Sequence, residues 1–464
     1  MPTRLPVITS LLLATAAVLA QPADNWPRKK LIETGWDQPD TARFRQNLAE
    51  MDKTPFDGVV VVCTGKTAEG KGISLRAAFC PEPWQEAWFQ TCLEDLQATK
   101  PTHLKDNFIA LGANPGNVDW FDDAGWKNVV EHWRIAARLA KQGGMKGLLF
   151  DPEPYTKGFS QFKYSMQAGN AQHTFADYYA QARERGRQVM EALKSEYPDM
   201  TLFCYFMNIA NYPAAGQPDP VQALAGAGYG LYAPFVDGWL DVIPPTLTLV
   251  DGCENAYLFS SRMQYVEAAL KIKGACQSLV SRANRAKYRA QTQVSFGIYL
   301  DAYLNPEGNT YYLGPKNGSR LNQLRDNVGN ALDAADEYVW VYGEKYRWWP
   351  TPNGGVKPES WEQVMPGVDA ALRFAADPVA AARQAMAQAN LPNLARNADF
   401  AAEKALSVTG AEVTYKEGGL PAGWGFWQEN TTGTAGWDRQ MGRTAPGAAK
   451  AWQVTGGCFT HEIG

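Results

Sequence analysis

The sequence predicts an α/β fold: a (β/α)8 TIM barrel followed by a small, incomplete β-sandwich module. Three observations support this prediction. Eight short runs of β-forming residues recur between residues 21 and 376, segments with helical periodicity separate them, and the composition changes beyond residue 376. Strands that alternate with helices form a parallel sheet, and eight such units close into a barrel. An open, doubly wound sheet is the structural alternative.

The first segment, residues 1–20, has the pattern of a secretory signal peptide. A single Arg4 precedes an apolar stretch, Leu11 to Leu19, and the segment ends on the small residue Ala20. The apolar stretch is short for a bilayer span, although an uncleaved N-terminal anchor is the alternative. We expect cleavage after Ala20 and a mature protein that is secreted or periplasmic, with no membrane partner after cleavage.

The predicted strands and helices alternate through the barrel domain, residues 21–376. The strands are Leu31–Gly35, Gly58–Cys63, Asn107–Leu111, Gly147–Asp151, Thr201–Phe206, Thr246–Asp251, Val294–Asp301 and Tyr338–Tyr342. The helices, defined by apolar residues at helical spacing, are Thr41–Met51, Pro83–Leu96, Trp126–Gln142, Thr174–Ser195, Arg262–Ala283, Leu321–Ala335 and Trp361–Ala375. The interval Asn208–Thr246 is long and rich in Pro and Gly, and no helix is assigned within it.

The chain changes character beyond the barrel. An Ala-rich helix and a linker are predicted over residues 377–396, and a β-rich module over residues 397–464. Asn397-Ala398-Asp399-Phe400 and Pro421-Ala422-Gly423-Trp424 resemble the opening of β-sandwich carbohydrate-binding modules found beside glycoside hydrolases. A complete sandwich of that kind needs about 100 residues, so we expect this module to be partial. An unrelated small β-domain is the alternative.

The composition excludes several classes of function. The chain has 44 Lys and Arg against 48 Asp and Glu, a formal net charge of −4, so no broad positive field is available for nucleic acid. Its four His residues form no HExxH motif, and its seven Cys residues form no paired CxxC clusters. We therefore expect no metal and no other cofactor. In an oxidising compartment these cysteines can form disulfides, but their pairing does not follow from the sequence.

The predicted fourth strand, Gly147–Asp151, ends in a pair of carboxylates. Asp151 and Glu153 each precede a proline, which disfavours helical torsions and keeps the segment extended. Alternation then places both side chains on the same side, at the carboxyl end of a strand, where this fold builds active sites. Like charges held close together raise one pKa, as a general acid at neutral pH requires. The alternative is a turn in which Asp151 caps backbone amides.

Alternation also identifies inward-facing residues on the last two predicted strands. It places inside the barrel or at its mouth two residues of the seventh strand, Tyr299 and Asp301, and three that belong to or follow the eighth, Trp340, Tyr342 and Glu344. Asp301 and Glu344 therefore join the fourth-strand pair as predicted catalytic carboxylates.

The fourth-strand segment resembles the signature of chitinase-type (family 18) glycoside hydrolases, in which an Asp two residues before a catalytic Glu ends this strand. Asp151 and Glu153 match these positions, whereas Leu149 and Lys146 occupy earlier acidic positions and Pro152 replaces an aromatic residue. The resemblance implies that Glu153 protonates the glycosidic oxygen and that Asp151 orients a substrate N-acetyl group. A broader resemblance, to barrel glycoside hydrolases as a group, covers residues 30–375.

In the two-carboxylate mechanism one residue protonates the leaving group while another attacks the anomeric carbon or activates water. Glu153 is the predicted acid. Its partner is Asp301 or Glu344, with Asp251 and Glu254 as further candidates after the sixth strand. The sequence does not rank these four.

Aromatic residues make up 12% of the chain, and many stand near Asp, Glu and Asn. Flat apolar faces surrounded by polar groups are typical of sugar-binding sites. The residues predicted to contact substrate are Trp36, Trp120, Tyr155, Glu254, Tyr299, Trp340 and Tyr342. For each aromatic residue the alternative is packing in the core or in a loop.

These observations predict a secreted glycoside hydrolase that acts on a polysaccharide or glycan by carboxylate general acid/base catalysis. The alternatives are a non-catalytic carbohydrate-binding protein on a hydrolase-like barrel and another secreted barrel enzyme, such as a lyase. Both the leading hypothesis and the binding-protein alternative name a carbohydrate as the partner.

Overall fold

The computed structural model describes residues 28–351 and 354–388 and, beyond them, the backbone of short strands between residues 403 and 460. The chain divides into two compact units, residues 1–379 and 380–464. The predicted signal peptide and the predicted linker after residue 390 lie outside the described residues, so export remains a prediction. Among the described helices, none is long and apolar enough to cross a membrane.

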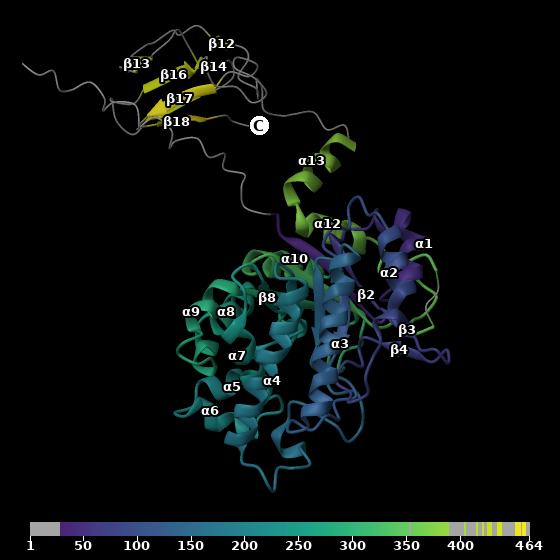
Figure 1. Cartoon of the computed structure of the whole chain (residues 1–464). Coiled ribbons are helices and arrows are strands. Elements are labelled where there is room, and N and C mark those ends of the chain that lie inside the picture. Colours follow the sequence, from purple (N-terminus) through teal and green to yellow (C-terminus); the bar gives the residue numbers. More distant parts are fainter. Residues whose placement is uncertain are drawn as a thin grey trace, which may run out of the picture. The chain divides into compact units, whose positions relative to one another are not determined.

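The first unit is an α/β TIM barrel, as the sequence predicts (Figure 1). Its strands are β1 (Lys30–Gly35), β2 (Gly58–Val61), β5 (Phe108–Gly112), β6 (Gly147–Asp151), β7 (Thr201–Cys204), β8 (Thr248–Asp251), β9 (Thr292–Val294), β10 (Phe296–Tyr299) and β11 (Tyr338–Gly343). Each neighbouring pair is parallel. This order excludes the open, doubly wound alternative, because β11 pairs with β1 over six residues.

Strands β9 and β10 are two halves of one barrel strand. Only Ser295 separates them, and its amide donates to the carbonyl of Asp251 at 2.9 Å. β9 pairs with β8 and β10 pairs with β11, so the ring passes through this break. The eight predicted strands therefore all exist, and the seventh is interrupted once.

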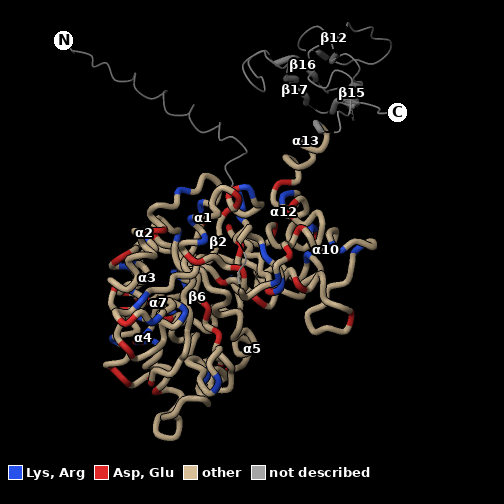
Figure 2. The backbone as a smooth tube through the Cα atoms, turned by 90° about the vertical axis from the view of Figure 1, so that its right-hand side faces the viewer, with Lys and Arg blue, Asp and Glu red and all other residues tan. Residues whose placement is uncertain are grey.

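The main helices lie on the outside of the barrel between successive strands (Figure 1). They are α1 (Thr41–Met51), α2 (Gln90–Ala98), α3 (Asp123–Gln142), α4 (Phe175–Glu196), α7 (Tyr232–Val242), α8 (Arg262–Lys273), α9 (Arg285–Gln291), α10 (Arg320–Ala334), α11 (Trp361–Val364) and α12 (Val368–Ala376). Figure 2 shows basic and acidic residues interspersed along the backbone of this unit.

Polar side chains define several helix starts. The Asp40 side chain accepts from the amide of Arg43 at the start of α1, and Thr174 and Asp177 form a reciprocal capping box at the start of α4. Such caps satisfy amides that have no partner within the helix. The predicted boundaries of α1 agree with the structure, and those of α4 and α10 differ by one residue at each end.

The interval 208–246 contains elements that the sequence did not define. Two short helices, α5 (Tyr212–Ala215) and α6 (Pro220–Ala223), precede α7, which packs on α4. Nine of the eleven residues of α7 are buried. Pro234 and Gly238 lie within α7, and both residue types disfavour helix interiors, so the sequence did not identify this helix.

Side chains fill the barrel interior. Trp340 on β11 is fully buried and donates from Nε1 to the carbonyl of Gly252, beyond the end of β8, at 2.7 Å. A Cβ on Gly297 would lie 2.7 Å from the rings of both Trp340 and Tyr257. Glycine at this position therefore leaves room for the large rings beneath the mouth of the barrel.

The second unit contains short β-strands. They are β12 (Glu403–Lys404), β13 (Thr414–Tyr415), β14 (Leu420–Pro421), β15 (Gly425–Gln428), β16 (Thr434–Asp438), β17 (Ala451–Thr455) and β18 (Gly457–Thr460). One further helix, α13 (Pro378–Gln388), follows α12 in the sequence. The assignment of residues 397–464 as a partial carbohydrate-binding module remains a prediction.

Candidate active site

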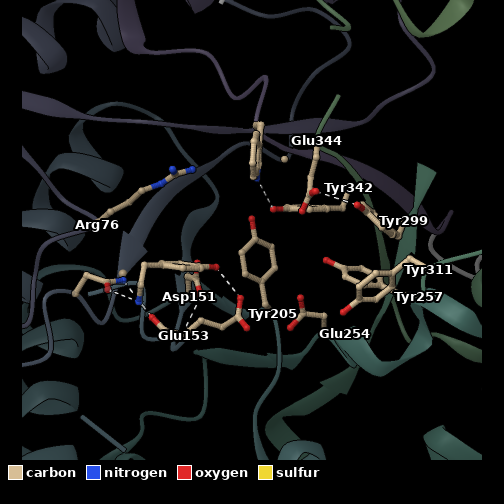
Figure 3. Close-up of a pocket in the computed structure, with 15 residues that line it drawn as sticks. Arg76, Asp151, Glu153, Tyr205, Glu254, Tyr257, Tyr299, Tyr311, Tyr342 and Glu344 are labelled. Carbon is tan, nitrogen blue, oxygen red and sulfur yellow. Dashed lines mark hydrogen bonds between the residues drawn. The ribbon is translucent and has the colours of Figure 1, made fainter. Parts of the chain in front are cut away.

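A cavity of about 530 Å³ opens at the carboxyl ends of the barrel strands (Figure 3). Its walls carry four carboxylates, a group of aromatic rings, one arginine and one amide. The lining residues are Gly35, Trp36, Arg76, Gly112, Asn114, Asp151, Glu153, Tyr155, Tyr205, Glu254, Tyr257, Tyr299, Tyr311, Tyr342 and Glu344. Eight of the residues predicted from the sequence to form the site line this cavity.

The segment after β6 is held in place by a set of hydrogen bonds. Oδ1 of Asp151 accepts from the amide of Glu153 at 3.0 Å, and the Tyr155 hydroxyl donates to Oε2 of Glu153 at 2.6 Å. Asn114, after β5, donates to the carbonyl of Glu153 at 3.1 Å and accepts from the amide of Tyr155 at 2.8 Å. These bonds fix the direction of the Glu153 carboxylate.

Asp151 is the more deeply enclosed member of this pair. Burial raises its pKa to about 7, and the charge of Glu153 adds to this effect, whereas the amide of Glu153, the Tyr155 hydroxyl and Arg76 favour the ionised form. The predicted upward pKa shift at the end of the fourth strand therefore falls on Asp151.

Glu254 is the third carboxylate of the cavity. It begins a 3-10 helix, Glu254–Leu258, directly after Cys253, whose φ of 45° turns the chain back toward the barrel mouth. The pKa of Glu254 is raised to about 8, mainly by burial and then by the negative charges of Glu153, Asp151 and Glu344. A hydrogen bond with Tyr257 acts in the opposite direction. Figure 3 shows its carboxylate pointing toward that of Glu153, beside the ring of Tyr205.

Glu344 lies on another wall, directly after β11. Its Oε2 accepts from the Tyr299 hydroxyl at 2.9 Å, and its amide donates to Oδ2 of Asp301 at 2.8 Å. Asp301 is fully buried, with Lys345 Nζ at 3.7 Å from Oδ1. The prediction that Asp301 is a catalytic carboxylate is therefore corrected: it does not line the cavity, and it positions Glu344.

Two predicted substrate-contacting tryptophans are also in the core. Trp120 is fully buried, stacks on Trp126 at 4.8 Å between ring centroids, and donates to the carbonyl of Gln161 at 3.0 Å. Trp340 is buried below the cavity floor, against Tyr205 and Tyr257. Both predictions of substrate contact are corrected, because loop and barrel packing cover these rings completely.

The remaining predicted aromatics line the cavity. Trp36 is 55% exposed at the rim, and its Nε1 donates to the Tyr342 hydroxyl at 3.1 Å. Tyr155 is 66% exposed on another part of the rim, and Tyr299 holds Glu344. The exposed rings of Trp36 and Tyr155 provide flat apolar faces next to the carboxylates.

Asp251 is not part of the cavity. It is fully buried at the end of β8, where Oδ1 and Oδ2 accept from the amides of Met207 and Ile209 at 2.9 and 3.1 Å. Burial raises its pKa to about 6 against the effect of these amides. It ties the segment after β7 to β8.

The sequence reasoning missed the side chains around Tyr205. The hydroxyl of Tyr205 lies 2.6 Å from Oγ1 of Thr34 and accepts from Nε2 of Gln38 at 3.3 Å. Arg76 donates to Gln38 in turn and lines the cavity. Tyr205 shares the parity of Phe203 on the predicted fifth strand, so alternation could have identified it. No local pattern identifies Arg76, which follows the hairpin of β3 (Thr64–Lys66) and β4 (Gly72–Ser74).

The described residues contain no group of three or more His, Cys, Asp or Glu side chains arranged to hold a metal ion. Three of the cavity carboxylates, Asp151, Glu153 and Glu344, accept hydrogen bonds from a backbone amide or from tyrosine hydroxyls.

Comparison with known proteins found no matching family model and no matching curated protein. Among solved structures, a GH5-4 broad-specificity endoglucanase from an uncultured bacterium is 12% identical, with a TM-score of 0.40, over 73% of this chain and 85% of that chain. A GH18 chitinase from Pseudoalteromonas aurantia is 11% identical, with a TM-score of 0.34, over 68% and 94% of the two chains. A glycoside hydrolase family 5 enzyme from Prevotella bryantii B14 is 10% identical, with a TM-score of 0.37, over 74% and 88%. The strand pairing described above, rather than these weak similarities, defines the barrel.

Proposed function

We propose that this protein is a secreted enzyme that hydrolyses glycosidic bonds, with Glu254 as the general acid and Glu153 as the second catalytic carboxylate. One observation carries the proposal: Glu153 and Glu254, from different strand ends, point toward one another in a cavity rimmed by exposed aromatic rings (Figure 3). Two carboxylates flanking a bond are what glycoside hydrolysis requires.

The division of roles follows from the surroundings of the two groups. Glu153 accepts a hydrogen bond of 2.6 Å from Tyr155, which holds its carboxylate in place for reaction with the anomeric carbon or with water. The pKa of Glu254 is raised to about 8 by burial and by neighbouring negative charges, so Glu254 holds a proton at neutral pH. The proposal therefore transfers the role of acid from Glu153, as predicted from the sequence, to Glu254.

In the reaction, the carboxyl proton of Glu254 moves to the glycosidic oxygen as the bond from that oxygen to the anomeric carbon breaks. Glu153 either attacks the anomeric carbon or removes a proton from the water that attacks it, and the leaving sugar departs as an alcohol. Trp36 and Tyr155 are exposed at the rim, where their rings can stack on the apolar faces of pyranose units.

A second mechanism is supported by the state of Asp151. Its pKa is raised to about 7 and it lies directly beside Glu153, as the family 18 resemblance would require of a residue that orients an N-acetyl group. In that mechanism Glu153 is the acid, the substrate acetamido oxygen is the nucleophile, and only N-acetylated sugars react.

A panel of polysaccharides and aryl glycosides, assayed with the wild type, E153Q and E254Q, tests the proposal. E254Q should lose about 10²–10⁴-fold on natural substrates and recover most on aryl glycosides with good leaving groups. E153Q should remain poor on both. Glu267 is exposed on α8, away from the cavity, so E267Q is a matched control for the charge change.

The alternatives give different patterns. Recovery of E153Q, rather than E254Q, on activated N-acetylated substrates would support the second mechanism. Saturable oligosaccharide binding by the wild type, with no turnover of any substrate and no effect of E254Q on binding, would support a non-catalytic binding protein. Release of unsaturated sugar products would indicate a lyase.

A further inference from the structure

Cys63 and Cys92 meet although 28 residues separate them. Cys63 lies between β2 and β3, and Cys92 is the third residue of α2. The thiol of Cys63 donates a hydrogen bond to the sulfur of Cys92, and the Cys92 sulfur also lies 3.4 Å from the carbonyl oxygen of Thr64. The two sulfurs are therefore direct neighbours.

The backbones of β3 and of the segment before α2 also pack closely against each other. A Cβ on Gly65 would lie 2.8 Å from the carbonyl oxygen of Trp88 and 3.0 Å from the ring of Phe89. These residues belong to the 3-10 helix Glu86–Phe89 that leads directly into α2. β3 thus lies against the start of α2, which keeps the two cysteines together.

We propose that Cys63 and Cys92 form a disulfide bond in the exported protein, joining the end of β2 to α2. Both residues are buried as thiols in the structure, with 0% and 5% of their surface exposed. Closing the bond brings the sulfurs from hydrogen-bonding distance to about 2.05 Å.

The chemistry needs an external disulfide, either a small-molecule disulfide or that of a thiol oxidoreductase. An unperturbed Cys thiol has a pKa of about 8.5, so part of the Cys92 population is thiolate near neutral pH before the chain has folded. During folding, before α2 packs, this thiolate attacks one sulfur of the oxidant and releases a thiolate. Cys63 then loses its proton and attacks the Cys92 sulfur of the mixed disulfide, which releases the second thiolate. The two protein thiols are oxidised, and the external disulfide is reduced to two thiols.

The bond would close a loop that reaches the cavity. The intervening chain contains the β3–β4 hairpin, the core residue Phe79 and Arg76, which lines the cavity. The amide of Leu75 donates to the carbonyl of Cys63, and the Arg76 carbonyl lies close to Gly112 of β5. A link between Cys63 and Cys92 therefore anchors both ends of the segment that presents Arg76.

Cys253 and Cys276 provide a comparison. These two thiols are also buried and near enough to influence one another, but Cys276 directs its hydrogen bond to the carbonyl of Asn208 at 3.5 Å. We expect this pair to remain as thiols.

Mass spectrometry of the full chain, purified from the exported fraction without reductant and alkylated in denaturant, tests the proposal directly. We expect one cross-linked pair of peptides, containing Cys63 and Cys92 and lighter by two hydrogen atoms than the reduced pair, while Cys80, Cys253 and Cys276 are alkylated. Complete alkylation of Cys63 and Cys92 without reductant, or a cross-link from either of them to another cysteine, would overturn the proposal.

Thermal unfolding gives a second measurement. Reductant should lower the Tm of the wild type by about 4–8 °C, and the double variant C63S/C92S should show no shift with reductant. Cys80 is a buried thiol within the same loop, so C80S is the matched control and should retain the full shift. If reductant lowered the Tm of C63S/C92S by as much as that of the wild type, the change in Tm would not come from a bond between Cys63 and Cys92. Neither readout depends on glycosidase activity, so the proposed function and the disulfide can fail separately.

Discussion

Tyr155 donates a hydrogen bond of 2.6 Å to Oε2 of Glu153, and the same ring is 66% exposed at the rim of the cavity. One side chain therefore both orients a proposed catalytic carboxylate and offers an apolar face to a ligand. These two roles can be separated by substitution.

Y155F should retain the exposed ring and lose the bond to Glu153. Hydrogen bonds to charged groups contribute about 1.5–3 kcal/mol, so we expect kcat to fall by about 10-fold or more while KM changes little. Y155A should lower kcat and also raise KM. Steady-state kinetics on one substrate separate the two effects, and an unchanged kcat in Y155F would show that the bond does not orient Glu153 for reaction.

The activity should fall as the pH rises through about 8, because the proposed acid Glu254 then loses its proton. Negative charge on Glu344 raises the pKa of Glu254, so E344Q should lower that pKa and move the basic limb of kcat/KM toward lower pH. The control E267Q should keep the wild-type profile. A basic limb that moves to higher pH in E344Q would contradict the assignment of Glu254.

Protein stability should also decrease as Glu254 loses its proton, over a lower pH range than activity. A free Glu side chain has a pKa of about 4.3, and in the folded protein the pKa of Glu254 is about 8. Between these values the folded state binds a proton that the unfolded chain has released, so stability falls as the pH rises through this window. E254Q should therefore have a higher Tm than the wild type at pH 8, with the difference closing toward pH 4. Equal Tm values at pH 8 would refute the raised pKa.

Trp36 and Trp120 should respond differently to the same substitution. W36A removes an exposed rim residue, so we expect KM to rise by about 10-fold, as loss of one stacking contact implies, with unchanged stability. W120A leaves a hole in the core and should cost about 3–5 kcal/mol of unfolding free energy. Urea denaturation and substrate titration of both variants measure the contrast. A large loss of unfolding free energy in W36A would show that the Trp36 ring stabilises the fold rather than serving mainly to contact substrate.

The N-terminus of exported protein should be Gln21, because the small residue Ala20 ends the predicted signal peptide. N-terminal sequencing of protein recovered outside the cytoplasm measures this directly. Material that begins at Met1 would indicate an uncleaved anchor instead.

The barrel was predictable because its signals are local. The Pro residues after Asp151 and Glu153 and the alternation of Tyr342 and Glu344 on the last strand each identify residues that line the cavity. Parity alone could not distinguish a residue at the mouth from one beneath it. Trp340 has the predicted inward parity, but it is covered by Tyr205 and Tyr257, which come from other parts of the chain. Asp301 lies in the 3-10 helix Leu300–Tyr303, beyond the end of β10 at Tyr299, so strand parity does not apply to it, and Lys345 lies beside it.

The remaining site residues depend on contacts between distant segments. Arg76 reaches the cavity from an irregular segment after a hairpin, and Asn114 acts through bonds to the segment after another strand. The sequence predicts Glu254 as a candidate, but its raised pKa depends first on burial and then on the charges of Glu153, Asp151 and Glu344. These contacts and charge interactions join segments that are far apart in the sequence, so no periodic pattern of residues indicates them.

The bond from the Trp340 indole to the carbonyl of Gly252 has a consequence for how a ligand enters. This hydrogen bond crosses the inside of the barrel. It joins β11, which precedes Glu344, to the turn that precedes Glu254. The two walls therefore keep their spacing whether or not a sugar is present. Tyr155 is held by its bond to Glu153, so adjustment to a ligand is left to the exposed ring of Trp36. We therefore expect selectivity to come from a cavity of nearly constant width.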